Sequence, residues 1–95
     1  MANKRDLKKD IRFLTEQVIM DSLEVAASFD KEADKKKVLD IIIELTQQHN
    51  ELLSRANHPD GKDNPKLVKK HYNTIISDLL DSCNNAYEKL GMIDR

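Results

Sequence analysis

Apolar residues recur every three or four positions in three separate stretches of the chain, at about residues 6–29, 31–56 and 65–90. This spacing places them on one face of a helix. Each stretch therefore predicts a long amphipathic helix whose apolar stripe faces a shared core. The predicted stripes are Leu7, Ile11, Leu14, Val18, Ser22, Val25 and Phe29, then Val38, Ile42, Leu45, His49, Leu52 and Ala56, and last Val68, Tyr72, Ile75, Leu79, Cys83, Ala86 and Leu90.

The predicted helix ends rest on capping and turn residues. Both prolines and a glycine interrupt the pattern in the segment 57–65. Asn64 before Pro65 is typical of an N-cap followed by proline in the first turn. Gly91 suits a left-handed residue after the third helix. For the second helix, Asp30 and Asp34 are both suitable N-caps, and the sequence does not choose between them.

Three helices of similar length with short connections predict an all-α, up-down-up bundle that forms a single domain over residues 1–95. The composition agrees, because Gly and Pro occur twice each and 35% of the residues are charged. No stretch has the length or apolar character of a secretory signal or a membrane span, so we expect a cytoplasmic protein without membrane contact. Cys83 is the only cysteine, so the chain forms no internal disulfide.

Short words of the sequence also resemble a known group of proteins. Lys4-Arg5-Asp6-Leu7-Lys8-Lys9 opens the first predicted helix, and Ala56-Asn57-His58-Pro59 precedes the third. In these words the chain resembles a family of small, uncharacterised all-helical proteins from Bacteroides-type bacteria. The resemblance brings no established activity, ligand or catalytic residue.

The chain shows no motif of catalysis, cofactor binding or metal binding. We therefore expect a protein that is not an enzyme and carries no cofactor. His49 lies on the core stripe; it is either a neutral core histidine bonded to the Tyr72 hydroxyl or a carbonyl, or a metal ligand with His71 and Asp10. The first alternative is favoured. Buried Cys83 is expected to be inert, and His58, Asp60 and Asp63 are assigned to turn formation.

Charge is distributed unevenly along the predicted bundle. An up-down-up arrangement collects ten basic side chains at one end, against five acidic ones, Asp6, Asp10, Glu51, Asp60 and Asp63. This end is consistent with weak binding of an acidic partner, an anion or a nucleic acid, but a simple solvated cap is the favoured interpretation, because the basic residues are mixed with acids and no aromatic residues lie between them. The candidate anion-binding residues are Lys4, Arg5, Lys8, Lys9, Arg12, Lys66, Lys69 and Lys70, with Arg55 and Lys62 nearby.

The first predicted helix has a second apolar face. Projection at 100° per residue puts Phe13, Met20, Leu23 and Ala27 opposite the core stripe. A three-helix bundle needs one inward stripe from each helix, so these side chains remain for another partner. The sequence therefore predicts a non-enzymatic interaction module that self-associates, as a homodimer, through this face. The alternative is a small regulatory protein that uses the basic end to bind nucleic acid or another anion.

Overall fold

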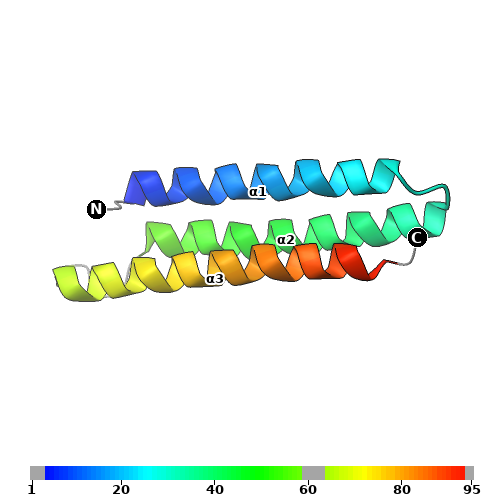
Figure 1. Cartoon of the computed structure of the whole chain (residues 1–95). Helices are drawn as coiled ribbons and strands as arrows, with labels where there is room; N and C mark the ends of the chain where they lie inside the picture. The colour runs from blue at the N-terminus through cyan, green and yellow to red at the C-terminus, as the bar shows by residue number, and fades with distance from the viewer. Residues whose placement is uncertain (1–3, 59–63, 94–95) are drawn as a thin grey trace.

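A computed structural model describes residues 4–58 and 64–93, which form three α-helices: α1 Lys4–Ala27, α2 Glu32–Asn57 and α3 Pro65–Met92. The helices run up, down and up in a rod about 53 Å long and 18 Å across (Figure 1). Each helix contacts both others, and the described residues contain no strand. The predicted all-α three-helix bundle is therefore confirmed.

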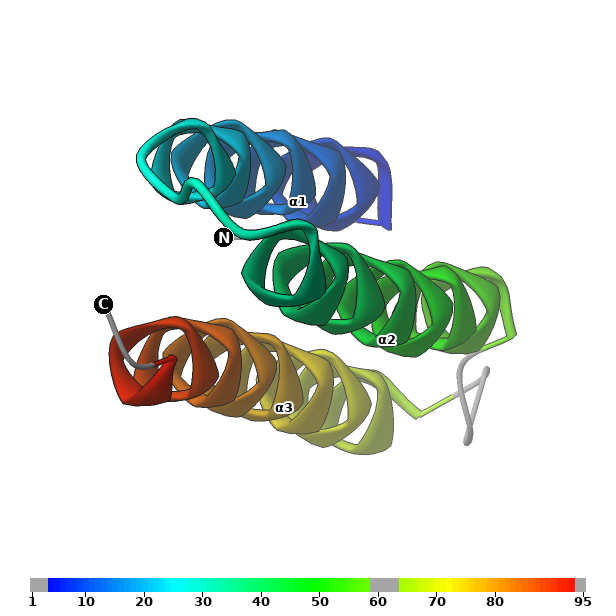
Figure 2. The ribbon, with the colours of Figure 1, turned by 90° about the vertical axis from the view of Figure 1, so that its right-hand side faces the viewer.

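The core lies where the three predicted stripes meet. Figure 2 shows α2 between α1 and α3, with the chain crossing from α1 to α2 at the end that faces the viewer. Most of the predicted stripe positions are buried or half-buried. Complete burial of apolar side chains stabilises the bundle by roughly 1.5–3 kcal/mol each. The most deeply buried side chains are Leu7, Ile11, Val18, Ser22, Val38, Leu45, His49, Ile75 and Leu79.

The first connection differs from the prediction. α1 ends at Ala27 rather than near residue 29, because the Ser28 and Phe29 N–H groups close the last turn on carbonyls three residues back. The chain leaves the helix there, and the Phe29 side chain packs into the core from the connection. Neither suggested aspartate caps α2. Lys31 occupies the N-cap without a side-chain hydrogen bond.

Acidic side chains in the first turn stabilise the start of α2 electrostatically. Glu32 and Asp34 lie inside its first turn, where their negative charge is favourable beside the helix N-terminus. Asp34 is therefore part of the helix and cannot cap it.

The two ends of α3 give one confirmed and one wrong prediction. The Asn64 side chain accepts hydrogen bonds from the N–H groups of Lys66 and Leu67, and Pro65 fills the first helical position, as expected. Gly91 is wrong as a left-handed terminator, because α3 continues to Met92. Burial of Ile93 explains the extension, since the helix must continue to bring that side chain to the core.

Replacing Gly91 by alanine is expected to stabilise the protein by about 0.5 kcal/mol, since glycine is entropically unfavourable inside a helix. A Cβ atom at Gly91 meets nothing within 4 Å, and its backbone is not left-handed. Urea denaturation followed by circular dichroism measures the change. A loss of stability instead would contradict the helical assignment of this last turn.

Candidate functional site

The outer face of α1, defined as Phe13, Met20, Leu23 and Ala27, is exposed as the projection indicates. Phe13 and Met20 are each 63% exposed and Leu23 is 50% exposed. The opposite side of α1 already supplies Leu7, Ile11, Val18 and Ser22 to the core. The outer face is therefore apolar surface that the bundle does not use.

Other large apolar side chains are exposed on α2 and α3, so the outer face of α1 is not alone. They are Leu39 and Ile43, one turn apart on α2, and Leu67, Leu80, Tyr87 and Met92 on α3.

Tyr87 differs from these residues because its polar end has a partner. Its hydroxyl donates to Asp21 of α1 at 2.5 Å, and this bond, with burial, raises the pKa of Tyr87 to about 12. Tyr87 thus joins α1 to α3.

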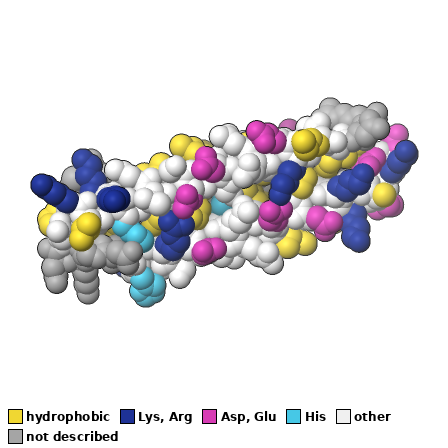
Figure 3. All heavy atoms as spheres, turned by 90° about the horizontal axis from the view of Figure 1, so that it is seen from below, with side chains coloured by type: hydrophobic (Ala, Val, Ile, Leu, Met, Phe, Trp, Pro, Cys, Tyr) yellow, Lys and Arg dark blue, Asp and Glu magenta, His cyan; other side chains and the backbone are white. Residues whose placement is uncertain are grey.

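Basic side chains lie at the end of the rod where α3 begins, and Figure 3 shows others toward the opposite end. Three hollows lie at the end where α3 begins. The α1 hollow, about 450 Å³, is lined by Lys4, Arg5, Lys8 and Arg12. The α3 hollow, about 500 Å³, is lined by Lys66, Lys69, Lys70, Asn73, Thr74, Ser77 and Asp78. The α2–α3 hollow, about 570 Å³, is lined by Ser54, Arg55, His58, Leu67, Lys70, His71 and Thr74.

The structure therefore places seven of the eight candidate anion-binding residues in hollows, and leaves Lys9 exposed on α1 outside them. Within the described residues, none of the eight forms an ion pair with a carboxylate. Lys62, Asp60 and Asp63, also assigned to this end or its turn, lie outside the described residues.

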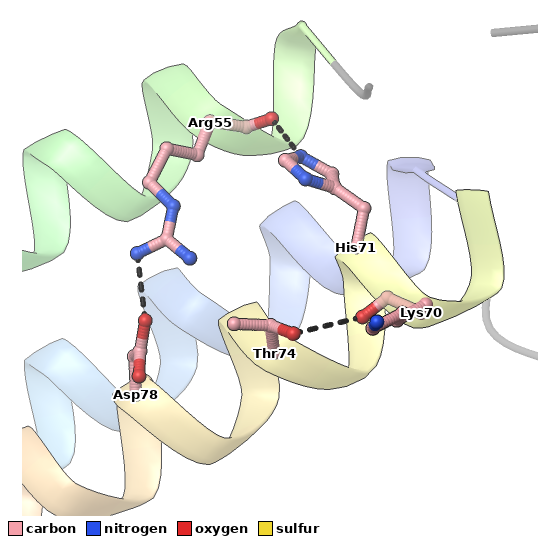
Figure 4. A network of polar contacts seen from close by, with 5 residues as sticks. All are labelled: Arg55, Lys70, His71, Thr74 and Asp78. Atoms are coloured by element: carbon pink, nitrogen blue, oxygen red, sulfur yellow. Dashed lines mark hydrogen bonds and ion pairs between the residues drawn. The ribbon is translucent and has the colours of Figure 1, made fainter. Parts of the chain in front are cut away.

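A polar network in the α2–α3 hollow was not anticipated from the sequence (Figure 4). The Arg55 guanidinium donates to an Asp78 carboxylate oxygen at 2.7 Å, and the His71 Nε2 donates to the Arg55 carbonyl at 2.7 Å. Thr74 donates to the Lys70 carbonyl at 3.0 Å. The first two bonds join Arg55 of α2 to Asp78 and His71 of α3, and the third lies within α3. Arg55 bonds Asp78 through Nη1, and its side chain also lines a neighbouring hollow with Glu51, Asp78 and Asp81.

His49 is a buried structural histidine at the junction of all three helices, with only 1% of its surface exposed. Its partners differ from the expected Tyr72. Nδ1 bonds the Thr15 hydroxyl of α1, and Nε2 lies 3.1 Å from the Ser82 hydroxyl of α3. Burial lowers the pKa of His49, because the protonated ring is poorly solvated there. The uncharged ring is thus the favoured form.

The direction of each hydrogen bond around His49 follows from the Thr15 hydroxyl of α1. Thr15 donates its own proton to the Ile11 carbonyl at 2.7 Å, so it accepts from Nδ1–H of His49. The neutral ring then presents Nε2 as an acceptor to Ser82. Ser82 also lies 2.6 Å from the Gln48 amide oxygen. The single Ser82 hydroxyl proton is therefore shared between His49 Nε2 and the Gln48 amide oxygen. If the Gln48 amide is rotated by 180°, its NH2 group donates to Ser82 and the hydroxyl proton is left for His49.

The metal alternative finds no support in the geometry. Among residues 4–58 and 64–93, no group of three or more His, Cys, Asp and Glu side chains is arranged to hold a metal ion. His49 and His71 are bonded to separate partners, in different parts of the bundle. Cys83 is buried, as predicted, and burial raises the pKa of its thiol, which disfavours the reactive thiolate.

In the part of the chain that the structure describes, no helix combines the length and apolar character needed to cross a membrane. Comparison with known proteins finds no match to a family model, to a curated protein or to a solved structure. The resemblance to the Bacteroides-type family therefore stays a prediction.

Proposed function

We propose that the protein is a non-enzymatic helical interaction module that self-associates through the outer face of α1. The observation that carries this proposal is the exposure of Phe13 and Met20, each 63% accessible, on a helix whose other side is already buried. Proteins that stay monomeric in water rarely expose contiguous apolar patches of this kind. Covering the patch with a second copy removes it from solvent.

Charge along α1 favours an antiparallel pair. Lys9 and Arg12 lie before Phe13, whereas Glu16 and Glu24 lie between Phe13 and Ala27, and all four are exposed. In a twofold antiparallel arrangement centred at the level of residue 18, Phe13 faces Leu23 of the second copy. Arg12 then faces the second copy's Glu24. A parallel pair would bring like charges together, which is destabilising.

Multi-angle light scattering between 1 and 100 µM tests the association. We expect a dimer, and we expect Phe13→Gln combined with Met20→Gln to shift the protein to monomer, because both apolar anchors of the outer face are lost. The matched control is Leu80→Gln combined with Met92→Gln, which changes two exposed apolar residues on α3. A wild-type monomer at 100 µM would exclude the proposal.

A charge-reversal series tests the orientation. Glu24→Lys alone should weaken the dimer, and adding Arg12→Glu should restore it, because the exchanged charges again face each other across the twofold axis. Failure of the double variant to recover, with the dimer otherwise intact, would reject the antiparallel pairing but not the self-association.

A further inference from the structure

We propose that the α3 hollow and the adjoining α2–α3 hollow form a binding surface for the phosphate backbone of a nucleic-acid duplex. The two hollows share Lys70 and Thr74, so they form one continuous surface. This binding is independent of the proposed self-association, which uses another helix.

The side chains of this surface are suited to phosphate oxygens. Lys66, Lys69 and Lys70 are exposed, and they take part in none of the ion pairs found in the described residues. Neutral donors lie between them. Side chains of Asn, Ser and Thr, together with Lys and Arg, are the usual partners of the nucleic-acid backbone. The neutral donors of the surface are Asn73 and Ser77, with Ser54 on α2, whereas the Thr74 hydroxyl already donates to the Lys70 carbonyl.

The positive charge is unfavourable for the protein alone. The lysines lie in the first two turns of α3, near the positive end of the helix dipole. Lys66, Lys69 and Lys70 are also neighbours at helical spacing, where like charges repel. A bound polyanion relieves both effects.

The shape of the surface favours a repeating anion over a single phosphate. Its cationic and neutral polar residues extend from Lys66 to Ser77, about 16 Å along the helix, with the three lysines in about the first 6 Å. Duplex DNA carries about one negative charge per 1.7 Å of its axis. Neighbouring phosphates of one duplex therefore contact all three lysines at the same time. The first turns of α3 also extend beyond the end of α2 (Figure 1), and Lys66, Lys69 and Lys70 on these turns are exposed.

The absence of stacking residues favours a duplex over a single strand. Proteins that bind single strands without sequence preference stack the bases on aromatic side chains. No aromatic ring other than the imidazoles of His58 and His71 lines the two hollows in the described residues, and the His71 ring is held by the Arg55 carbonyl. A ligand whose bases are already stacked requires no such platform.

Asp78 provides the sharpest test. It is the one carboxylate among the described lining residues of the two hollows, and it neutralises Arg55 at 2.7 Å. Asp78→Asn removes the negative charge and frees the guanidinium for phosphate. We expect this variant to bind a duplex about threefold more tightly at low salt.

The experiment is fluorescence anisotropy with a labelled 20-base-pair DNA duplex of mixed sequence. With about four phosphate contacts, the wild-type affinity should fall roughly a hundredfold between 50 and 200 mM salt. The triple variant K66Q/K69Q/K70Q should flatten the slope of log K against log salt by about three units. The matched control, K31Q/K36Q/K37Q, removes three exposed lysines at the other end of the rod and should keep most of the wild-type slope.

The alternatives give different results. The proposal is overturned by absence of binding at 50 mM salt, by weaker binding of Asp78→Asn, or by equal losses in the two triple variants. Tighter binding of a single strand of the same length would also overturn it. Displacement of the duplex by polyglutamate at equal charge would indicate an acidic protein partner instead, and displacement by millimolar pyrophosphate would indicate a small phosphate ligand.

Discussion

Ile75→Ala is expected to lower the free energy of unfolding by about 3 kcal/mol, the typical cost of deleting a large aliphatic side chain from a packed core. Ile75 is completely buried, and it lies in the middle of α3 against the shared core. A domain of this size is stabilised by only about 5–15 kcal/mol, so the loss is a large part of the total. Urea denaturation followed by far-ultraviolet circular dichroism measures it.

Ile43→Ala is the matched control, because it removes the same atoms from a helical site that is 55% exposed. We expect a change within about 0.5 kcal/mol, since little apolar surface is lost from the core and alanine has a high helix propensity. Equal losses at Ile75 and Ile43 would show that α3 does not present the face described here to the core.

The architecture could be predicted because it depends on local periodicity. A helical residue such as Leu7, Val38 or Ile75 is buried with its neighbours three and four positions away, so the sequence alone identifies the inner face. The same geometry identifies the outer face, which is why the exposure of Phe13 and Met20 was also predicted. No knowledge of how the helices pack is needed for either result.

The helix ends were less predictable, because tertiary packing decides them. Phe29 was placed inside the first helix since it continues the apolar stripe, yet it reaches the core from the connection. Gly91 resembles a terminator, but burial of Ile93 extends the helix beyond it. In both places a buried side chain near the end of a helix overrides the local signal.

The contacts between helices depend on their axial register, and the apolar periodicity of the sequence does not specify this register. Counting outward from the second connection puts His49 level with Tyr72, whereas the structure pairs it with Ser82. The count fails because the first turns of α3 extend beyond the end of α2 (Figure 1). The same offset brings Arg55 to His71 and Asp78 and creates the network in Figure 4.

Replacement of His49 by leucine is expected to leave stability at pH 8 within about 1 kcal/mol of the wild type, because no partner loses its last hydrogen bond. Thr15 still donates to the Ile11 carbonyl, and Ser82 still donates to the Gln48 amide oxygen. Leucine is also apolar and of similar size, which suits a site with 1% exposure. A loss of several kcal/mol would show that the imidazole itself holds the three helices together.

Acid is expected to destabilise the wild type more than His49→Leu. Burial holds the pKa of His49 below its ordinary value of 6.5 in the folded protein. Below pH 6.5 the His49 ring therefore becomes protonated in the unfolded chain while it is still neutral in the folded protein. The free energy of unfolding then falls by up to about 1.4 kcal/mol per pH unit, until the folded ring also becomes protonated. At pH 5 the difference reaches at most about 2 kcal/mol. Urea denaturation of both proteins at pH 8, 7, 6 and 5 separates this contribution from that of the other titrating groups. Parallel stability curves over that range would show that His49 accepts a proton as readily in the folded protein as in the unfolded chain.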